Sequence, residues 1–172
     1  NEFSEYGRMP TARFVSTDIV ALTQSTVSHF TAQHPSIAFS MVSDERIPEM
    51  LLDPEQIRGV VINVLNNSVA AVDGSTGAIS IRLTFDRKGR RAVLEFADNG
   101  PGIPAADKNR IFEPYFTTKR GGTGLGLAIV SSVVSDHQGE VMVFDNTPKG
   151  SRFVISLPQH PQPGTVRRLS HA

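Results

Sequence analysis

Four segments alternate apolar and polar residues with the period of two that is typical of β-strands, and they come in two closely spaced pairs. Ala78 to Phe85 and Arg91 to Ala97 form one pair, and Val141 to Phe144 and Arg152 to Leu157 form the other. Strands separated by such short connections pair antiparallel as hairpins. Any fold that contains these segments therefore has a sheet that is mostly antiparallel.

Helical patterns precede and separate the two hairpins. A short strand is predicted from Thr11 to Ser16 and a longer one from Ser36 to Ser43, with Thr17 or Asp18 suited to cap a first helix between them. This predicted helix carries apolar residues at helical spacing, namely Ile19, Leu22, Val27 and Phe30.

Two further helices are predicted. Asp53-Pro54-Glu55 opens a long one, because Asp can cap and Pro suits the first turn, and it ends near Asp73-Gly74. The other runs from Gly124 to about His137, where Gly139 stops it. Strands in hairpins with helices between them indicate an α+β two-layer sandwich, with a mixed, mostly antiparallel sheet and helices on one face.

The length of 172 residues suits one domain with one core. We expect this domain at residues 11–158. Residues 1–10 are polar and end at a proline, so they are interpreted as the end of an upstream element. Residues 159–172 are rich in proline and polar residues and are expected to be a mobile tail.

Charge and composition exclude several classes of protein. Lys plus Arg equal Asp plus Glu at 17 each, so no overall field attracts nucleic acid or an anionic membrane. The chain has no cysteine, which excludes disulfides and thiolate metal sites and fits a reducing cytoplasm. No apolar run reaches the roughly 20 residues that span a bilayer. We expect a cytoplasmic domain without contact to nucleic acid or membrane.

Asn63 and Asn67 lie four residues apart in the second predicted helix and share one face of it. Two amide oxygens on one face could hold a hard cation such as Mg²⁺ together with phosphate oxygens. A solvated polar stripe is the alternative, because Asn66 is adjacent.

Asp98 follows a predicted strand and precedes Asn99-Gly100-Pro101-Gly102. A carboxylate at a strand end can accept a hydrogen bond from the exocyclic amine of a purine, while the glycines let the backbone pass close to the base. An ordinary Asp-Asn-Gly turn is the alternative.

The glycine run from Gly121 to Gly126 leads into the third predicted helix. Backbone N–H groups at a helix start, together with the helix dipole, can cradle phosphates. A flexible linker is the alternative, although Leu125 and Leu127 interleave with the glycines. Phe112 to Lys119 mixes aromatic residues with Thr117, Thr118 and Lys119, which suits either a phosphate contact or a structural turn.

Taken in this order, the four clusters resemble the ATP-binding superfamily of histidine kinases, gyrase, the heat-shock chaperone of ninety kilodaltons and mismatch-repair ATPases, which share the Bergerat-type fold. The similarity runs from about Asp53 to Leu157. Asn63 to Ser68 is similar to the asparagine box, Asp98 to Gly102 to the first glycine box, Phe112 to Lys119 to the phenylalanine box, and Gly122 to Leu127 to the second glycine box.

The phenylalanine box, here FEPYFTTK followed by GTGLGLAIV, is particular to the histidine-kinase branch, and Gly150 to Phe153 resembles the closing strand of that branch. The opening EFSEYGRMP resembles the end of the second dimerisation helix in nitrogen-regulation kinases of the NtrY type.

The resemblance implies roles for individual residues. Asn67 is the expected Mg²⁺ ligand with Asn63 as its helper, and Asp98 is the expected adenine-reading carboxylate. Further nucleotide contacts are implied at Gly100, Gly102, Ile103, Phe112, Thr118, Lys119, Gly122, Thr123, Gly124, Leu125, Gly126 and Leu127. A lid over the triphosphate is expected from about Glu113 to Thr123.

Two departures from the family pattern bear on the phosphates. Ser68 stands where Ala is usual, and Ala70 and Ala71 leave no Lys or Tyr one turn on. Lys119 or an arginine could supply the missing phosphate contact, and Lys119 is assigned with Asn63 and Asn67 to the catalytic group.

The implied function is that of the ATP-binding catalytic domain of a two-component sensor histidine kinase. It binds ATP·Mg²⁺ and transfers the γ-phosphoryl group to a histidine on a separate dimerisation domain of the homodimer, and a response regulator acts downstream. None of the five histidines is followed by an acidic residue, as the acceptor would be. The parent protein is compatible with an anchor in the inner membrane.

Two alternatives to the kinase stay open. One is an ATP-hydrolysing conformational clamp of the same superfamily, which a glutamate at the position of Asn63 would favour. The other is a nucleotide-sensing module without catalysis.

Overall fold

The computed structural model describes residues 9–118 and 122–162. Its main sheet has five strands in the order β2-β4-β5-β7-β6. Only β2 and β4 pair parallel, and the other neighbours pair antiparallel. The strands are β2 (Ala38–Ser43), β4 (Ala78–Asp86), β5 (Arg91–Asp98), β6 (Glu140–Asp145) and β7 (Ser151–Pro158).

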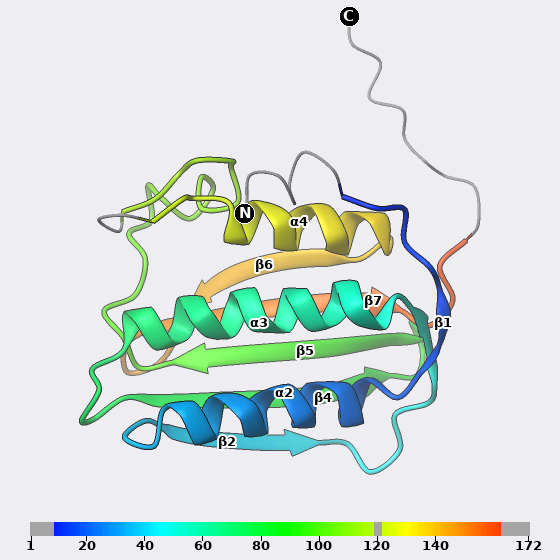
Figure 1. The fold of residues 1–172 in the computed structure, drawn as a ribbon, viewed down its shortest axis with the longest axis horizontal. Coiled ribbons are helices and arrows are strands. Elements are labelled where there is room, and N and C mark those ends of the chain that lie inside the picture. The colour runs from blue at the N-terminus through cyan, green and yellow to red at the C-terminus, as the bar shows by residue number, and fades with distance from the viewer. Residues whose placement is uncertain (1–8, 119–121, 163–172) are drawn as a thin grey trace, which may run out of the picture.

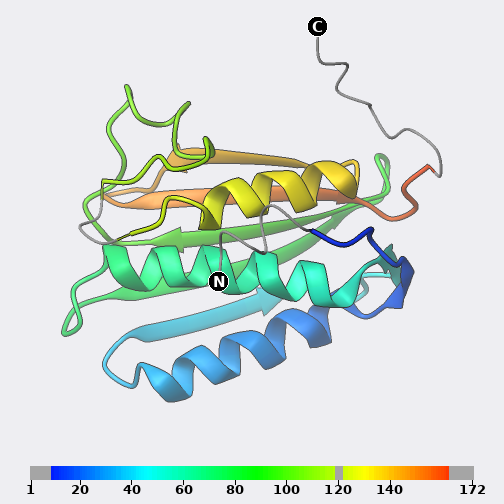
Figure 2. The same cartoon turned by 45° about the horizontal axis from the view of Figure 1, so that its top comes forward.

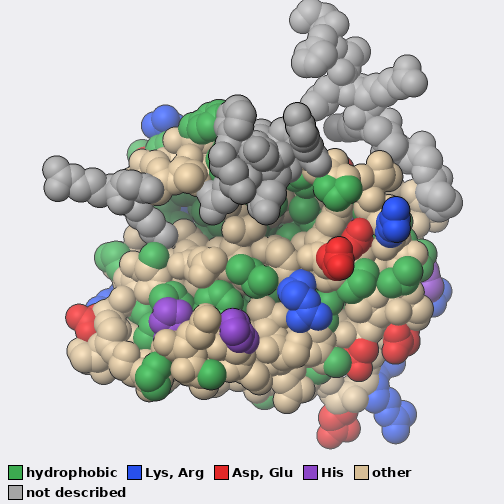
Figure 3. All heavy atoms as spheres, in the orientation of Figure 1, with side chains coloured by type: hydrophobic (Ala, Val, Ile, Leu, Met, Phe, Trp, Pro, Cys, Tyr) green, Lys and Arg blue, Asp and Glu red, His purple; other side chains and the backbone are tan. Residues whose placement is uncertain are grey.

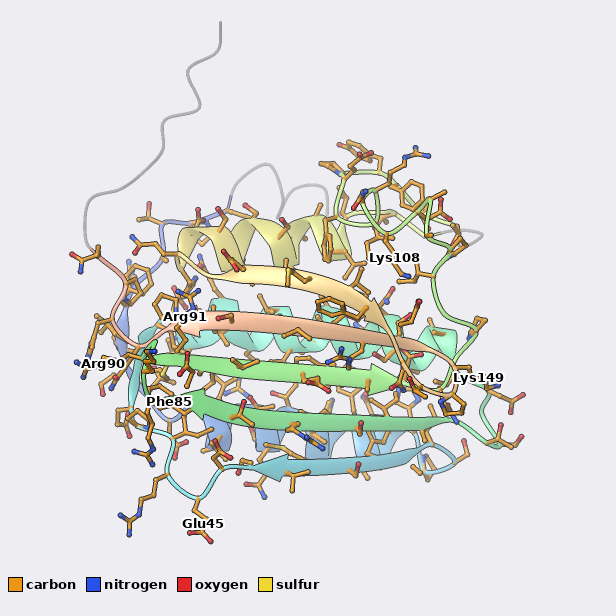
Figure 4. The ribbon with its side chains drawn as sticks, turned by 180° about the vertical axis from the view of Figure 1, so that it is seen from behind. Glu45, Phe85, Arg90, Arg91, Lys108 and Lys149 are labelled. Carbon is orange, nitrogen blue, oxygen red and sulfur yellow. The ribbon has the colours of Figure 1, made fainter. Side chains whose placement is uncertain are left out.

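Three helices, α2 (Ile19–Gln33), α3 (Pro54–Ala71) and α4 (Gly126–Asp136), lie side by side on one face of this sheet (Figures 1 and 2). The other face carries no helix in the described part of the chain, as the view from behind shows (Figure 4). The predicted α+β sandwich is therefore confirmed, with both hairpins and all three helices in place.

The core lies between the two layers. Alternate residues of the strands point inward, so Ile79, Ile81 and Leu83 of β4 are at most 1% exposed. Val61, Val64 and Leu65 of α3 are fully buried opposite the sheet. The helix-covered face shows few charged side chains over α2 and α3 (Figure 3), and α2 contains no Asp, Glu, Lys or Arg.

A second, two-stranded sheet lies at one end of the molecule, where β1 (Val15–Thr17) pairs antiparallel with β3 (Met50–Leu52). The strand predicted from Thr11 to Ser16 is wrong in its bounds, and β3 was missed. Three residues are too short to display an alternation, so only the tertiary pairing defines these strands.

Asp53 joins three segments at that end. Its carboxylate accepts from the main-chain N–H groups of Glu55 and Gln56 at 3.1 Å, which caps α3. The same carboxylate accepts from the N–H of Arg13 at 2.8 Å, which fastens the chain that enters β1.

His137, at the end of α4, completes this junction. It is 1% exposed, and its Nδ1 lies 2.8 Å from the carbonyl of Val133. Its Nε2 accepts from the N–H of Asp53 at 3.1 Å, so the ring is neutral with the proton on Nδ1. Burial lowers the pKa of His137, and the Val133 carbonyl and the Asp53 charge only partly offset this.

The segment after β7 continues along the same end. The main-chain oxygen of Gln159 accepts from Leu51 at 3.0 Å, and Gln138 and Gln162 exchange two hydrogen bonds at 2.6 and 2.8 Å. Ordered contacts thus extend four residues beyond Pro158, where the domain was expected to end. Among the described residues, no helix combines the length and the apolar character needed to cross a bilayer.

Candidate nucleotide-binding site

A cavity of about 450 Å³ opens at the opposite end of the helix layer, between α3, the end of β5, the start of α4 and the long connection that follows β5. It is lined by Asn63, Asn66, Asn67, Ala70, Ala71, Asp98, Pro101, Gly102, Ile103, Pro104, Asp107, Ile111, Phe116, Thr117, Thr118, Gly122, Thr123, Gly124, Gly126, Leu127 and Ser151. Segments far apart in the sequence therefore converge on one site.

Most of the site residues predicted from the sequence line this cavity. Gly100, Leu125 and Phe112 do not line it. Gly100 is buried, and Leu125 is 2% exposed and belongs to the protein interior. The ring of Phe112 packs edge-on against that of Phe153, with 6.3 Å between the ring centres. Lys119 lies outside the described residues. Of the lid range, residues 113–118 and 122–123 are described, and 119–121 are not.

Asp98 ends β5 at the bottom of the cavity and is 1% exposed. Its Oδ1 accepts from the N–H of Gly100 at 2.9 Å and from the N–H of Ser151 at 3.3 Å. Hydrogen bonds from two main-chain donors stabilise a buried carboxylate. Gly100 must be small, because a Cβ there would lie 2.7 Å from the carbonyl of Ala71.

Asn63 and Asn67 enter the cavity from α3, which Asp53 caps and buried apolar residues hold against the sheet. Asn63 faces the start of α4, since a Cβ on Gly126 would lie 3.2 Å from its Oδ1. The Asn63 amide thus stands beside the N-terminus of α4, where main-chain N–H groups have no partner within the helix, and Asn67 lines the same cavity. Amide oxygens at this place fit a magnesium ion that is shared with phosphates.

The glycine run reaches α4 through a left-handed residue. Gly124 has φ of +72°, and its carbonyl accepts from the N–H of Tyr115 at 2.9 Å. A Cβ at Gly124 would lie 2.5 Å from the main chain of Tyr115. The glycine therefore lets the connection fold back on itself directly above the helix start.

The connection from Gly102 to Phe116 is stabilised by an ion pair and a cation–π contact. Lys108 pairs with Asp145 of β6 at 2.7 Å, and the guanidinium of Arg110 lies 4.6 Å from the ring centre of Phe116. Phe116 lines the cavity, whereas Tyr115 has positive φ and is 59% exposed.

The sequence interpretation missed several lining residues. Asn66, Ala70 and Ala71 share the helical spacing of Asn63 and Asn67, which could have revealed them. Asp107 and Ser151 carried no such signal, because only the tertiary fold brings them to the cavity. Among the described lining residues, the charged ones are Asp98 and Asp107, and none is Lys or Arg.

Comparison with known proteins agrees with this architecture. Residues 52–161 match the family described as histidine kinase-, DNA gyrase B-, and HSP90-like ATPase. The chain belongs to this ATPase family. The matched range contains the whole described cavity together with α3, α4 and the hairpins that position it.

The similar proteins include some that are named sensor histidine kinases. Nitrogen regulation protein NtrY of Azorhizobium caulinodans is 33% identical over 91% of this chain, which spans 21% of the length of that relative. Full-length ShkA in complex with AMPPNP has a TM-score of 0.81 at 25% identity, over 94% of this chain and 34% of that one. ThkA in complex with the response regulator TrrA also has a TM-score of 0.81 at 25% identity, over 95% and 47% of the two chains.

Proposed function

We propose that this chain is the ATP-binding catalytic domain of a two-component sensor histidine kinase. The observation that carries the proposal is the convergence of Asp98, the Asn63–Asn67 pair and the start of α4 on one cavity. Each group fits a different part of ATP. Asp98 fits the base, the two asparagines fit a metal ion bound to the triphosphate, and the start of α4 fits the terminal phosphates. Family membership and the AMPPNP complex of ShkA support ATP as the ligand.

The base end of the nucleotide lies at Asp98 in this proposal. The carboxylate accepts from the exocyclic amine of adenine, while Gly102 and Ile103 leave room for the ring. The side chains of Asn67 and Asn63 hold Mg²⁺, with Asn67 as the ligand. The ion would neutralise charge that develops on the transferring phosphoryl group.

The phosphates extend toward α4, where N–H groups near Gly122, Gly124 and Gly126 can donate to their oxygens. In the transfer step, a histidine nitrogen attacks the γ-phosphorus, the bond to the β–γ bridging oxygen breaks, and ADP leaves. Catalysis by this chain then consists of positioning and charge neutralisation. Asn63 offers no carboxylate to activate water, which favours transfer over hydrolysis.

The partners belong to the proposal as well. The acceptor histidine lies on the dimerisation domain of a homodimeric parent protein, and a response regulator receives the phosphoryl group. The complex of ThkA with a response regulator supports the second part.

Calorimetric titration with ATP, in the presence and absence of Mg²⁺, tests the proposal directly. We expect binding that Mg²⁺ strengthens, and a lack of binding under both conditions contradicts the proposal. Asn67→Asp should keep the circular dichroism spectrum but abolish Mg²⁺-dependent transfer to an added dimerisation domain, because the metal ligand changes and the core does not. Full transfer by this variant removes Asn67 from the metal site.

A further inference from the structure

The peptide group that joins Asp98 to Asn99 lies beyond the end of the β5–β7 ladder. The paired register runs from Arg91 with Pro158 to Ala97 with Arg152 and stops there. The carbonyl of Asp98 nevertheless has a donor on the β7 side, because Nδ2 of Asn146 donates to it at 2.8 Å. A side chain from the β6–β7 turn thus replaces a strand partner.

The turn itself is shaped to make this contact. The N–H of Asn146 donates to the carbonyl of Gly150 at 2.9 Å, which closes the turn. Gly150 has φ of +107°, and a Cβ there would collide with the same Asp98 oxygen. Close approach of Gly150 and the hydrogen bond from Asn146 therefore fix one carbonyl from two directions.

Asn99 holds the other side of the peptide. Its N–H donates to Ala78 at 3.2 Å, and its side chain accepts from Ala78 at 2.9 Å and donates to Thr76 at 2.9 Å. The Asn146 side chain thus holds the oxygen of this peptide, the carbonyl of Ala78 holds its N–H, and the Asn99 side chain bonds to the start of β4 and the turn before it. These contacts fix the main chain on both sides of Asp98, whose carboxylate accepts from the N–H groups of Gly100, two residues on, and of Ser151 on β7.

We propose that Asn146 is a positioning residue for base recognition, which aims the Asp98 carboxylate at the exocyclic amine of the purine through the main-chain carbonyl of Asp98. This inference rests on the proposed function, because it needs Asp98 to be the residue that meets the base. Asn146 lies outside the cavity lining, so it acts through Asp98 and does not touch the nucleotide.

The chemistry of the asparagine side chain is specific to this task. The amide supplies an N–H donor to a partly buried carbonyl, and alanine leaves that carbonyl without its donor. Aspartate has the same shape, but its carboxylate turns an acceptor toward the acceptor carbonyl. Asn146→Ala and Asn146→Asp therefore separate the hydrogen bond from the space that the side chain fills.

The test compares two nucleotides by calorimetry on the whole chain with Mg²⁺: ATP and purine riboside triphosphate, which lacks the exocyclic amine. We expect Asn146→Ala to weaken ATP binding about fivefold, the size of one ordinary hydrogen bond, and Asn146→Asp at least as much. Binding of purine riboside triphosphate should stay unchanged in both variants. Lys149→Ala is the matched control, since Lys149 is exposed on the same turn (Figure 4).

The ratio of the two affinities is the decisive quantity. Partial unfolding of a variant lowers the affinity for both nucleotides equally, so its effect cancels in the ratio. An equal loss for both nucleotides assigns Asn146 a purely structural role and overturns the inference. Unchanged ATP binding, or wild-type binding by Asn146→Asp, overturns it too. Asp98→Asn serves as the benchmark: if this variant keeps the full preference for ATP, the proposed adenine contact itself fails.

Discussion

At the scale of single residues, the site depends on where polar groups are buried. Asp98 keeps a carboxylate in a place that is 1% exposed, and main-chain N–H groups of Gly100 and Ser151 make that possible. A charged group in such surroundings forms strong hydrogen bonds with a ligand, because water does not compete for it. His137 is the opposite case, because its burial lowers its pKa and favours the neutral ring at the other end of the helices.

Replacing Asp98 by Ala should weaken ATP binding about tenfold or more, because a hydrogen bond that involves a charged group contributes roughly 1.5–3 kcal/mol. Calorimetry with ATP and with ADP measures this loss. Circular dichroism of the variant serves as the control for folding. Unchanged affinity in a folded variant removes Asp98 from the site.

His137 makes the stability of the domain depend on pH. Its pKa is lowered in the folded state, mainly by burial, so the unfolded chain binds this proton more readily. Its contribution is therefore fully present above about pH 6.5, the ordinary pKa of histidine, and is lost as the pH falls below that value.

Urea unfolding followed by circular dichroism at pH 7.5 and pH 5.5 measures this effect. We expect His137→Gln to lower stability at pH 7.5 and to reduce the difference between the two pH values. His29→Gln, on the exposed face of α2, should keep the difference found in the unmodified chain. Equal pH dependence in all three proteins contradicts the role of His137.

At the scale of elements, both α3 and the start of α4 line the cavity, and the two helix starts are built differently. Asp53 and Pro54 begin α3 with side-chain caps, whereas α4 begins at Gly126 with no side-chain cap on Leu125. An uncapped helix start leaves main-chain donors that a phosphate can satisfy. The glycines of the two helices accordingly serve different purposes.

Gly59 and Gly124 offer a matched pair of substitutions. Gly59 lies within α3 with nothing within 4 Å of an added Cβ, so Gly59→Ala should raise the free energy of unfolding by about 0.5–1 kcal/mol through helix propensity. Gly124→Ala should lower it, because Gly124 has positive φ and abuts Tyr115. Urea unfolding measures both, and destabilisation by Gly59→Ala is the outcome that the structure does not allow.

The sequence was sufficient to predict the elements that have a strong local signal. Asp53-Pro54 marked the start of α3, and the alternations of β4 and β5 marked a hairpin, because these patterns depend on neighbouring residues alone. β3 and the contacts of Gln159 to Gln162 were not predictable, since they form only when distant segments meet. For the same reason no local pattern placed Asp107 at the cavity, and the strand motif that contains Ser151 did not show that it reaches there, while Asn63 and Asp98 were recognisable from their motifs.

At the scale of the whole molecule, the proposed phosphoryl transfer requires an acceptor from another domain. We expect the chain to bind ATP without labelling itself, and a separate polypeptide that carries the dimerisation helices and their histidine to become labelled when it is added. A tether raises only the effective concentration of the acceptor, so it is not essential.

Incubation with radiolabelled ATP, alone and with the dimerisation helices, decides between the outcomes. A product that is labile in acid and stable in base identifies phosphohistidine. Strong labelling of this chain by itself contradicts the proposed division of labour. Labelling of neither polypeptide favours a nucleotide-binding module without catalysis.

The helix α3 joins the two ends of the domain, with Asp53 fastened to the entering chain at Arg13 and Asn67 in the cavity. At 1.5 Å per residue these two positions are about 20 Å apart. Val61, Val64 and Leu65 hold the helix against the sheet, so it keeps a fixed spacing between the point where the chain enters the domain and the cavity at the other end.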